Sequence, residues 1–332
     1  MRTRVTLIPG DGIGPEVTAA TAKVLEAAGA SIEWETVHAG QHAFETTGVP
    51  VPKEVFDSIR RNRVALKGPL QTPKGHGFRS ANVTIRQTLQ LFTGLRPVKT
   101  LPGIETPYKN VDLVVLRENT QGLYAGIEHE IQPGTVISMK VSTRDAGERI
   151  AKWAFEYMRY RGRNRIDCCH KNSVSPMADG AFLDAFKEVG ADYPFIEQGD
   201  LPIDRLAMAL AIEPTQFDVL LLQNLYGDII SDVCAGLVGG LGVVPGANVG
   251  DKIAVFEAVH GTAPDIAGKG IANPLAVLLS GVMMLEHIGQ HRVAGKIEAA
   301  IWDVLEEGKH LTGDLGGSAD TNEFTNALID KL

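Results

Sequence analysis

Two carboxylates stand four residues apart in the segment Asn224-Leu-Tyr-Gly-Asp-Ile-Ile-Ser-Asp232. Residues at this spacing share one face of a helix, so Asp228 and Asp232 can point the same way. Two hard oxygen ligands on one face suit Mg²⁺ or Mn²⁺ with positions left open for substrate oxygens. In the alternative reading, Asp228 caps the helix and Asp232 faces water. Spacing alone favours that alternative, so the flanking sequence has to decide.

The flanking sequence supports the metal reading. A glycine-rich run, 236–242, follows the carboxylates, and further on comes Glu257-Ala-Val-His-Gly-Thr-Ala-Pro-Asp-Ile-Ala-Gly-Lys-Gly-Ile-Ala-Asn-Pro274. Together these segments resemble the signature pair of the isocitrate/isopropylmalate dehydrogenase family, the metal-dependent β-decarboxylating dehydrogenases. The resemblance covers nearly the whole chain. It implies a two-lobed α/β fold distinct from the Rossmann fold, with a dimer arm on the small lobe, and a homodimer whose active sites are shared between subunits.

The resemblance also implies how the chain divides into lobes. Both chain ends, about residues 1–98 and 238–332, would form the large cofactor-binding lobe. Residues 99–237 would form the small lobe, with substrate and metal residues and the dimer interface.

Composition excludes several classes of protein. A chain of 332 residues exceeds what one domain usually needs, which agrees with two lobes. The net charge of −8 disfavours a nucleic-acid-binding surface, and no block of Lys or Arg contradicts this. Three cysteines without metal-ligand spacing favour free thiols in a reducing compartment. With neither a signal-peptide pattern nor a membrane-length apolar run, we expect a cytoplasmic protein, or a mitochondrial matrix protein if a presequence was removed.

Apolar runs alternate with segments of helical period, which predicts helices packed on a largely parallel sheet. The exception is 130–141, which has the pattern of a hairpin. The expected strands are 5–8, 64–66, 113–116, 165–169 and 219–222, and the expected helices are 14–28, 144–160, 179–189, 227–238, 274–287 and 293–307.

The turn Gly10-Asp-Gly-Ile-Gly-Pro15 follows a predicted strand and opens a predicted helix. Its glycine spacing is not that of the dinucleotide fingerprint, so a tight strand-to-helix turn is at least as good an interpretation. Members of the family open with a similar turn and bind the cofactor mainly elsewhere.

Three arginines, Arg86, Arg96 and Arg117, are expected near strand or loop ends. Guanidinium forks pair bidentately with carboxylates, although each arginine alone could equally form a surface ion pair. With Ser80 and Asn82 they resemble the substrate-binding set of the family. The S-x-N pattern is that of isocitrate-specific members, in which two polar side chains meet the third carboxylate of the substrate.

The resemblance assigns the metal to Asp204, Asp228 and Asp232, with Asp204 donated by the neighbouring subunit. Taken alone, Asp204 would be read as a helix N-cap. The resemblance further makes Lys171 the proton shuttle, contributed by the partner chain, and Tyr124 the acid that protonates carbon. Here the chain departs from the family pattern, because Ser173 stands where most relatives have Asn, and Pro176 follows; we expect this departure to affect nicotinamide positioning and rate.

The segment beginning at His260 carries the expected cofactor site. Asp265 can accept hydrogen bonds from ribose hydroxyls and would repel a 2′-phosphate, which predicts NAD rather than NADP. NADP-using relatives tend to have Lys-Tyr at the positions of Asp265 and Ile266. The resemblance implies cofactor contacts at Thr72, His260, Gly261, Thr262, Ala263, Asp265, Ile266 and Asn273.

The function implied is oxidative decarboxylation of isocitrate to 2-oxoglutarate and CO₂, with NAD⁺ and Mg²⁺ or Mn²⁺. Two alternatives stay open. One is another 3-substituted malate, such as homoisocitrate, as substrate. The other is a weakly active regulatory subunit that pairs with an active partner. No membrane or nucleic-acid partner is expected.

Overall fold

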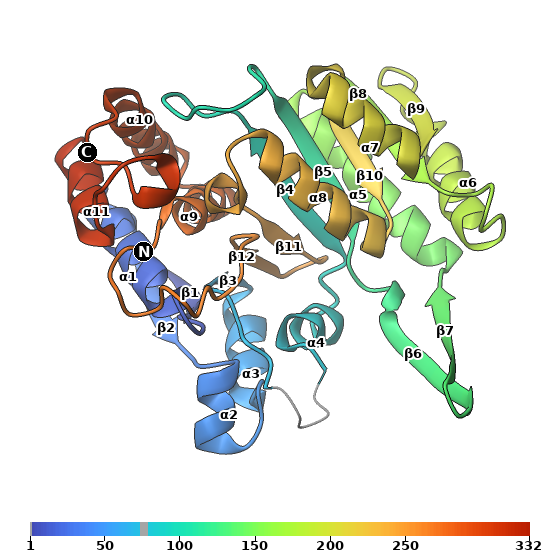
Figure 1. Cartoon of the computed structure of the whole chain (residues 1–332), viewed down its shortest axis with the longest axis horizontal. Helices are drawn as coiled ribbons and strands as arrows, with labels where there is room; N and C mark the ends of the chain where they lie inside the picture. Colours follow the sequence, from blue (N-terminus) through green and yellow to red (C-terminus); the bar gives the residue numbers. More distant parts are fainter. Residues whose placement is uncertain (1, 74–78) are drawn as a thin grey trace. The chain divides into compact units, whose positions relative to one another are not determined.

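The structure is a computed structural model that describes residues 2–73 and 79–332. Contacts divide the chain into two compact units (Figure 1). The first unit comprises residues 1–91, 100–107 and 238–332, and thus holds both chain ends. The second comprises 92–99 and 108–237. Residues 92–99 group with the second unit because their strand pairs antiparallel with the strand that starts at Asp112.

In the first unit five strands are hydrogen-bonded in the order β2-β1-β3-β12-β11. All pairs are parallel except β11 with β12. The elements are β1 Thr3–Ile8, α1 Gly14–Ala27, β2 Ile32–Thr36, α2 Gln41–Thr47, α3 Lys53–Asn62, β3 Val64–Lys67, α4 Ala81–Thr88, η2 Leu241–Val243, β11 Ala247–Val249, β12 Ala254–Glu257, α9 Leu275–His287, α10 His291–Glu307, η3 Gly313–Leu315 and α11 Thr321–Asp330.

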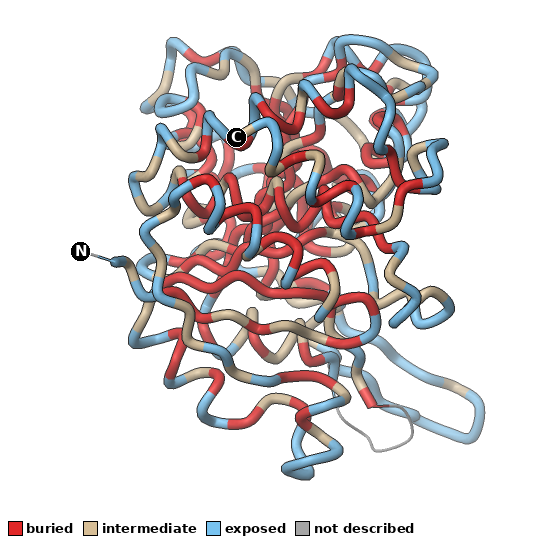
Figure 2. The backbone as a smooth tube through the Cα atoms, turned by 90° about the vertical axis from the view of Figure 1, so that its left-hand side faces the viewer, coloured by how far each residue is buried: buried red, intermediate tan, exposed pale blue. Residues whose placement is uncertain are grey.

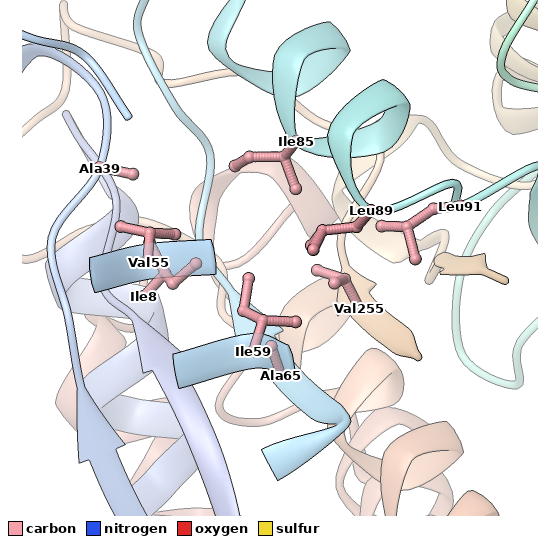
Figure 3. Packing of buried hydrophobic residues seen from close by; sticks show 9 residues of the cluster. All are labelled: Ile8, Ala39, Val55, Ile59, Ala65, Ile85, Leu89, Leu91 and Val255. Carbon is pink, nitrogen blue, oxygen red and sulfur yellow. The ribbon is translucent and has the colours of Figure 1, made fainter. Parts of the chain in front are cut away.

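Burial explains why these strands form. Strands β3 and β12 are buried along their whole length, as expected of parallel strands covered on both faces. Helices α9 and α11 pack against α1. A cluster of buried side chains lies between α3, α4 and the strands, and Figure 3 shows its members. They are Ile8, Ala39, Val55, Ile59, Ala65, Ile85, Leu89, Leu91 and Val255.

In the second unit the strand order is β4-β5-β10-β8-β9, with only β4 and β5 antiparallel. A separate antiparallel ribbon, β6 with β7, is exposed along most of its length (pale blue in Figure 2). The elements are β4 Thr93–Lys99, β5 Asp112–Glu118, β6 Gly122–Gln132, β7 Thr135–Val141, α5 Arg144–Arg161, β8 Arg165–His170, α6 Ala178–Gly190, β9 Glu197–Pro202, α7 Ile203–Ile212, η1 Pro214–Gln216, β10 Val219–Leu222 and α8 Asn224–Leu237.

The α/β alternation and the hairpin predicted from sequence are confirmed. Helix α1 carries Pro15 in its first turn, as predicted. Helix α8 begins at Asn224, three residues before the expected start. Asp228 therefore lies inside the helix, which excludes the reading in which it is the N-cap. Among the described residues, no helix is both long enough and apolar enough to cross a bilayer.

Candidate functional site

Helix α8 and strand β5 bring one group of predicted residues together in the second unit. Arg117, at the end of β5, has a buried side chain whose Nε donates to Asn224 Oδ1 at 3.0 Å. Its Nη1 forms an ion pair with Asp228. The close approach requires Gly227, because a Cβ there would lie 2.6 Å from Arg117 Cγ. Gly227 thus leaves room for the side chain of Arg117 to lie against α8.

Tyr124 completes this group. Its hydroxyl donates to Asp228 Oδ2, and Arg117 Cζ lies 5.0 Å from the centre of its ring. Burial and the negative charge of Asp228 raise the pKa of Tyr124, while Arg117 opposes the shift. The phenol therefore keeps its proton at neutral pH, which is the state that a general acid needs.

Arg96, on β4, approaches both carboxylates of α8. Its Nη2 lies 3.6 Å from Asp228 Oδ1, and its Nη1 lies 4.0 Å from Asp232 Oδ1. The carboxylate of Asp232 is 59% exposed. Partial desolvation raises its pKa; Arg96 opposes the shift and the charge of Asp228 adds to it. The carboxylates of Asp228 and Asp232 stand four residues apart on one helix face and offer oxygen ligands that fit a divalent cation of the hard class.

Asp204 does not join these carboxylates within one chain. Across residues 2–73 and 79–332, the structure contains no cluster of three or more His, Cys, Asp or Glu side chains that could hold a metal ion. Asp204 lies in the first turn of α7, after the N-cap Pro202, so it is not the N-cap that spacing alone would suggest. Its carboxylate pairs with Lys171 Nζ, which lowers the pKa of Asp204.

Lys171 directly follows β8, and its backbone is fixed by a buried carboxylate. Its N–H donates to Asp179 Oδ2 at 2.7 Å, and Asp179 is fully buried at the start of α6. Ser173 is exposed in the turn that links the two elements. The sequence analysis did not identify Asp179, although it lies only eight residues after the predicted proton shuttle.

The predicted substrate residues of the first unit lie on α4. Ser80 is the N-cap of this helix, and its hydroxyl accepts from Val83 N at 3.5 Å. Arg86 Nη2 donates to Glu257 Oε1 at 3.0 Å. Two buried polar atoms, Arg86 Nε and Asn82 Oδ1, have no hydrogen-bond partner within the described part of the chain. A donor and an acceptor of this kind suit a ligand that carries both carboxylate and hydroxyl groups.

A second place in the first unit gathers predicted cofactor residues. A pocket of about 440 Å³ is lined by His260, Ile266 and Asn273, and the other lining residues are Ile13, Gly242, Ile271, Gly313, Asp314, Ser318 and Ala319. Burial lowers the pKa of His260, so the ring is neutral at pH 7. Its Nδ1 lies 3.0 Å from Gly261 O, and its Nε2 is buried without a partner among the described residues. With Nδ1–H donating, Nε2 is an acceptor for a ligand hydroxyl or amide.

The remaining predicted cofactor residues lie on two loops of the first unit. Thr72 Oγ1 accepts from Ala81 N at 3.0 Å, at the start of α4. Ala263 has a positive φ of 38°, a strained conformation that is typical of ligand-binding loops. Asp265 is exposed. Sequence reasoning missed Ile13 and Asp314 as lining residues. The first belongs to the Gly10–Pro15 turn, whereas the second has no distinctive motif around it.

Comparisons with known proteins identify the family of the chain. The family model described as isocitrate/isopropylmalate dehydrogenase matches residues 4–328. The chain is 50% identical to isocitrate dehydrogenase (NAD) catalytic subunit 5, mitochondrial, of Arabidopsis thaliana, covering 98% of this chain and 88% of the relative. It is 48% identical to a mitochondrial regulatory subunit of isocitrate dehydrogenase (NAD) from Dictyostelium discoideum, covering 99% of this chain and 92% of that relative.

A solved structure extends the likeness to three dimensions. The crystal structure of isocitrate dehydrogenase from Methylococcus capsulatus superimposes with a TM-score of 0.96, at 46% identity, covering 100% of this chain and 99% of that one. The fold class and the resemblance predicted from the motifs are thereby confirmed. On the match over 4–328 and these identities, the chain belongs to the isocitrate/isopropylmalate dehydrogenase family.

Proposed function

We propose that this protein catalyses the oxidative decarboxylation of isocitrate to 2-oxoglutarate and CO₂ with NAD⁺ and a divalent metal. The observation that carries the proposal is the group formed by Arg117, Tyr124 and Asp228. It combines a carboxylate-binding fork, a protonated phenol and an oxygen ligand, which are three of the kinds of group that this reaction needs. The relatives named as NAD isocitrate dehydrogenase subunits support the same activity.

Each of these residues has a role that follows from its chemistry. Arg86, Arg96 and Arg117 pair with carboxylates of the substrate. Ser80 and Asn82 bind its third carboxylate. Lys171, as the neutral amine, would take the proton of the substrate hydroxyl when bound NAD⁺ accepts the hydride. Tyr124 then donates its proton to the carbon from which CO₂ has departed. Because the pKa of Tyr124 is raised from a value that is ordinarily well above 7, this proton is present at pH 7.

The metal would be Mg²⁺ or Mn²⁺, held by Asp228 and Asp232 of one chain and Asp204 of another. When bound, it supplies Lewis acidity at the substrate hydroxyl and the adjacent carboxylate. The donor set is all oxygen, which is the set that both ions prefer.

The cofactor would be NAD, with its adenosine end at the pocket lined by His260, Ile266 and Asn273. The unpartnered His260 Nε2 offers an acceptor there. Asp265 disfavours a 2′-phosphate by charge repulsion, which gives the preference for NAD over NADP.

The decisive experiment is a steady-state assay of the purified protein. Isocitrate, homoisocitrate, isopropylmalate and tartrate are each tested with NAD⁺ and NADP⁺, with Mg²⁺, Mn²⁺ or EDTA. We expect the highest kcat/KM for isocitrate with NAD⁺, and none with EDTA. A higher value for homoisocitrate would make that the substrate.

A regulatory role is the second candidate. The Dictyostelium relative named as a regulatory subunit, and the departures at Ser173 and Pro176, favour it. The presence of Lys171, Tyr124 and the three aspartates favours the catalytic role. If the protein alone is inactive but stimulates an active relative, the regulatory role is correct.

We further propose a homodimer with active sites shared between copies. The ribbon β6–β7 and helices α7 and α8 expose large apolar side chains, among them Ile131, Val136, Met208, Ile212 and Ile229. Mixing Lys171→Met with Asp228→Asn tests the sharing. One site of the mixed dimer would regain all its groups, so exchanged protomers should recover activity that neither variant has alone.

For the compartment we propose one that is reducing, either the cytoplasm or the mitochondrial matrix. The names of the Arabidopsis and Dictyostelium relatives specify mitochondria. Cys168, Cys169 and Cys234 are free and buried, and burial raises the pKa of each thiol.

A further inference from the structure

The Gly10–Pro15 turn contains a buried carboxylate that has no part in the chemistry above. Asp11 is 7% exposed and accepts three backbone hydrogen bonds. Gln41 N and Gln71 N donate to its Oδ2 at 2.9 and 2.8 Å, and His42 N donates to its Oδ1 at 3.0 Å. One side chain therefore joins three segments of the first unit: the turn after β1, the start of α2 and the loop after β3.

The loop after β3 leads directly to predicted ligand residues. Gln71 precedes Thr72, whose hydroxyl accepts from Ala81 N at the start of α4. The backbone of the turn adds a further tie to the same loop, because Asp11 N donates to Pro69 O at 2.8 Å. Asp11 thus fixes both the loop that carries Thr72 and, through it, the entry to the helix that carries Asn82 and Arg86.

The same turn holds the second cofactor loop. Ile13 N donates to Thr262 O at 3.0 Å. Gly12 has φ +61° and packs so closely that an added Cβ would lie 2.0 Å from Thr262 O. Gly40 approaches the carboxylate itself, since a Cβ there would lie 1.9 Å from Asp11 Oδ2. These contacts leave no room for side chains, so the glycines are required by close packing on both sides of the turn.

We propose that Asp11 is a positioning residue that sets the loops carrying Thr72 and Thr262 at the separation that NAD needs. The Gly10–Pro15 turn then supports cofactor binding by holding two loops in place, and it does not itself bind the phosphates. A carboxylate suits the task because it accepts from several N–H groups at once, whereas an amide has one acceptor oxygen and two N–H donors. The inference rests on the proposed function, since it takes these loops to be cofactor loops.

The test uses Asp11→Asn in the full-length protein. The amide oxygen can replace only one carboxylate oxygen, so at least one backbone N–H is left facing an NH₂ group. We expect the Kd for NADH, measured by fluorescence titration without substrate, to rise about tenfold. The KM for NAD⁺ should rise in parallel, with kcat within threefold. The Mg²⁺ dependence should stay unchanged, because Asp228 and Asp232 lie in the other unit.

Three further variants make the test specific. Asp57→Asn is the same substitution at an exposed position on α3 and should bind NADH normally. Ser58→Ala removes a buried hydroxyl that lies 2.8 Å from Thr6 Oγ1, so it should lower the melting temperature without changing the Kd for NADH. Gly40→Ala displaces the Asp11 carboxylate from outside and should raise the Kd for NADH as Asp11→Asn does.

The outcomes separate the inference from the function. If the parent protein does not bind NADH, the proposed function fails. If the parent binds, and Asp11→Asn lowers the melting temperature but keeps the Kd for NADH within twofold, as Ser58→Ala does, then Asp11 is only structural and the inference is wrong. If Asp11→Asn does not fold, Gly40→Ala decides by the same measure.

Discussion

The guanidinium of Arg117 is paired with the carboxylate of Asp228, so a residue predicted to bind substrate contacts one predicted to bind metal. Asn224 Oδ1 accepts from the same guanidinium, at 3.0 Å from Nε and 2.7 Å from Nη2. The arginine is therefore oriented by the protein and does not depend on ligand for its position. Because the guanidinium is already oriented, less side-chain entropy is lost when a ligand carboxylate binds. The pair therefore favours a preformed carboxylate site.

The clearest metal test is Asp232→Asn. Its carboxylate is largely exposed, so its removal should leave the fold intact, whereas Asp228→Asn would also disturb the buried Arg117. We expect both variants to lose metal-dependent turnover, with the melting temperature of Asp232→Asn within a few degrees of the parent. Asp184→Asn, on the surface of α6, is the matched control. Near-normal activity of Asp232→Asn at ordinary Mg²⁺ would refute the metal assignment.

Lys171→Met should lower kcat by about 10²–10⁴-fold, the usual contribution of a general acid–base group. Methionine keeps the length and apolar stem of the side chain but cannot carry a proton. The KM for isocitrate should change much less than kcat. Lys187→Met, another lysine of the second unit that pairs with a carboxylate, serves as control and should stay active. A Lys171→Met enzyme nearly as fast as the parent would contradict the proton-shuttle role.

Asp265→Lys combined with Ile266→Tyr should move cofactor preference toward NADP⁺. The change removes a charge that repels the 2′-phosphate and adds a cation that attracts it. The measurement is the ratio of kcat/KM for NAD⁺ and NADP⁺. A ratio that stays within threefold of the parent value would show that Asp265 does not face the ribose.

Ser173→Asn introduces the residue that the family resemblance predicts at this position. A carboxamide reaches further than a hydroxyl and has two N–H donors. We expect kcat or the KM for NAD⁺ to change several-fold while metal dependence stays the same. Ser175→Asn, in the same turn, controls for a general effect on the loop. If both kinetic constants of Ser173→Asn match the parent, Ser173 does not act at the nicotinamide.

Glu257 gives the protein a distinct acid response. Although burial alone would raise its pKa, Lys67 and Arg86 hold the pKa of this carboxyl well below the usual range. Because the folded value is lower than the unfolded one, its contribution to stability is full above about pH 4.3 and falls as pH drops further. Glu257→Gln leaves Lys67 buried without its counter-charge, so the free energy of unfolding at pH 7 should fall by about 3–5 kcal/mol.

Urea unfolding from pH 3 to 7 measures this effect. The difference between parent and Glu257→Gln should shrink toward acid pH, and the exposed Glu298→Gln should follow the parent at every pH. A difference that is constant with pH would mean that the Glu257 charge does not stabilise the fold. The double variant Lys67→Met/Glu257→Gln should recover part of the loss, since it removes the uncompensated cation.

Sequence by itself determined the chemistry that this chain can carry and the alternation of its elements. The carboxylate pair at 228 and 232 follows from helical periodicity, which is a local property. The strands predicted at 64–66 and 219–222 could be found from sequence because a fully buried parallel strand is read as a continuous apolar run; the first extends one residue further, to Lys67. The start of α8 was predicted three residues late, at Gly227; the helix begins at Asn224, and Gly227 lies within it, where it leaves room for Arg117.

Only the tertiary structure decided which of these groups meet. It brings Arg117 to Asp228, which is more than a hundred residues away in the sequence. It pairs Asp204 with Lys171 of the same chain. It also places the Asp11 carboxylate where three separate backbone segments donate to it. Motif spacing carries no information about such contacts, because they depend on strand order and on how closely a glycine lets two segments approach. The sequence therefore determined the kinds of functional group present, and the packing of strands and loops decided their partners.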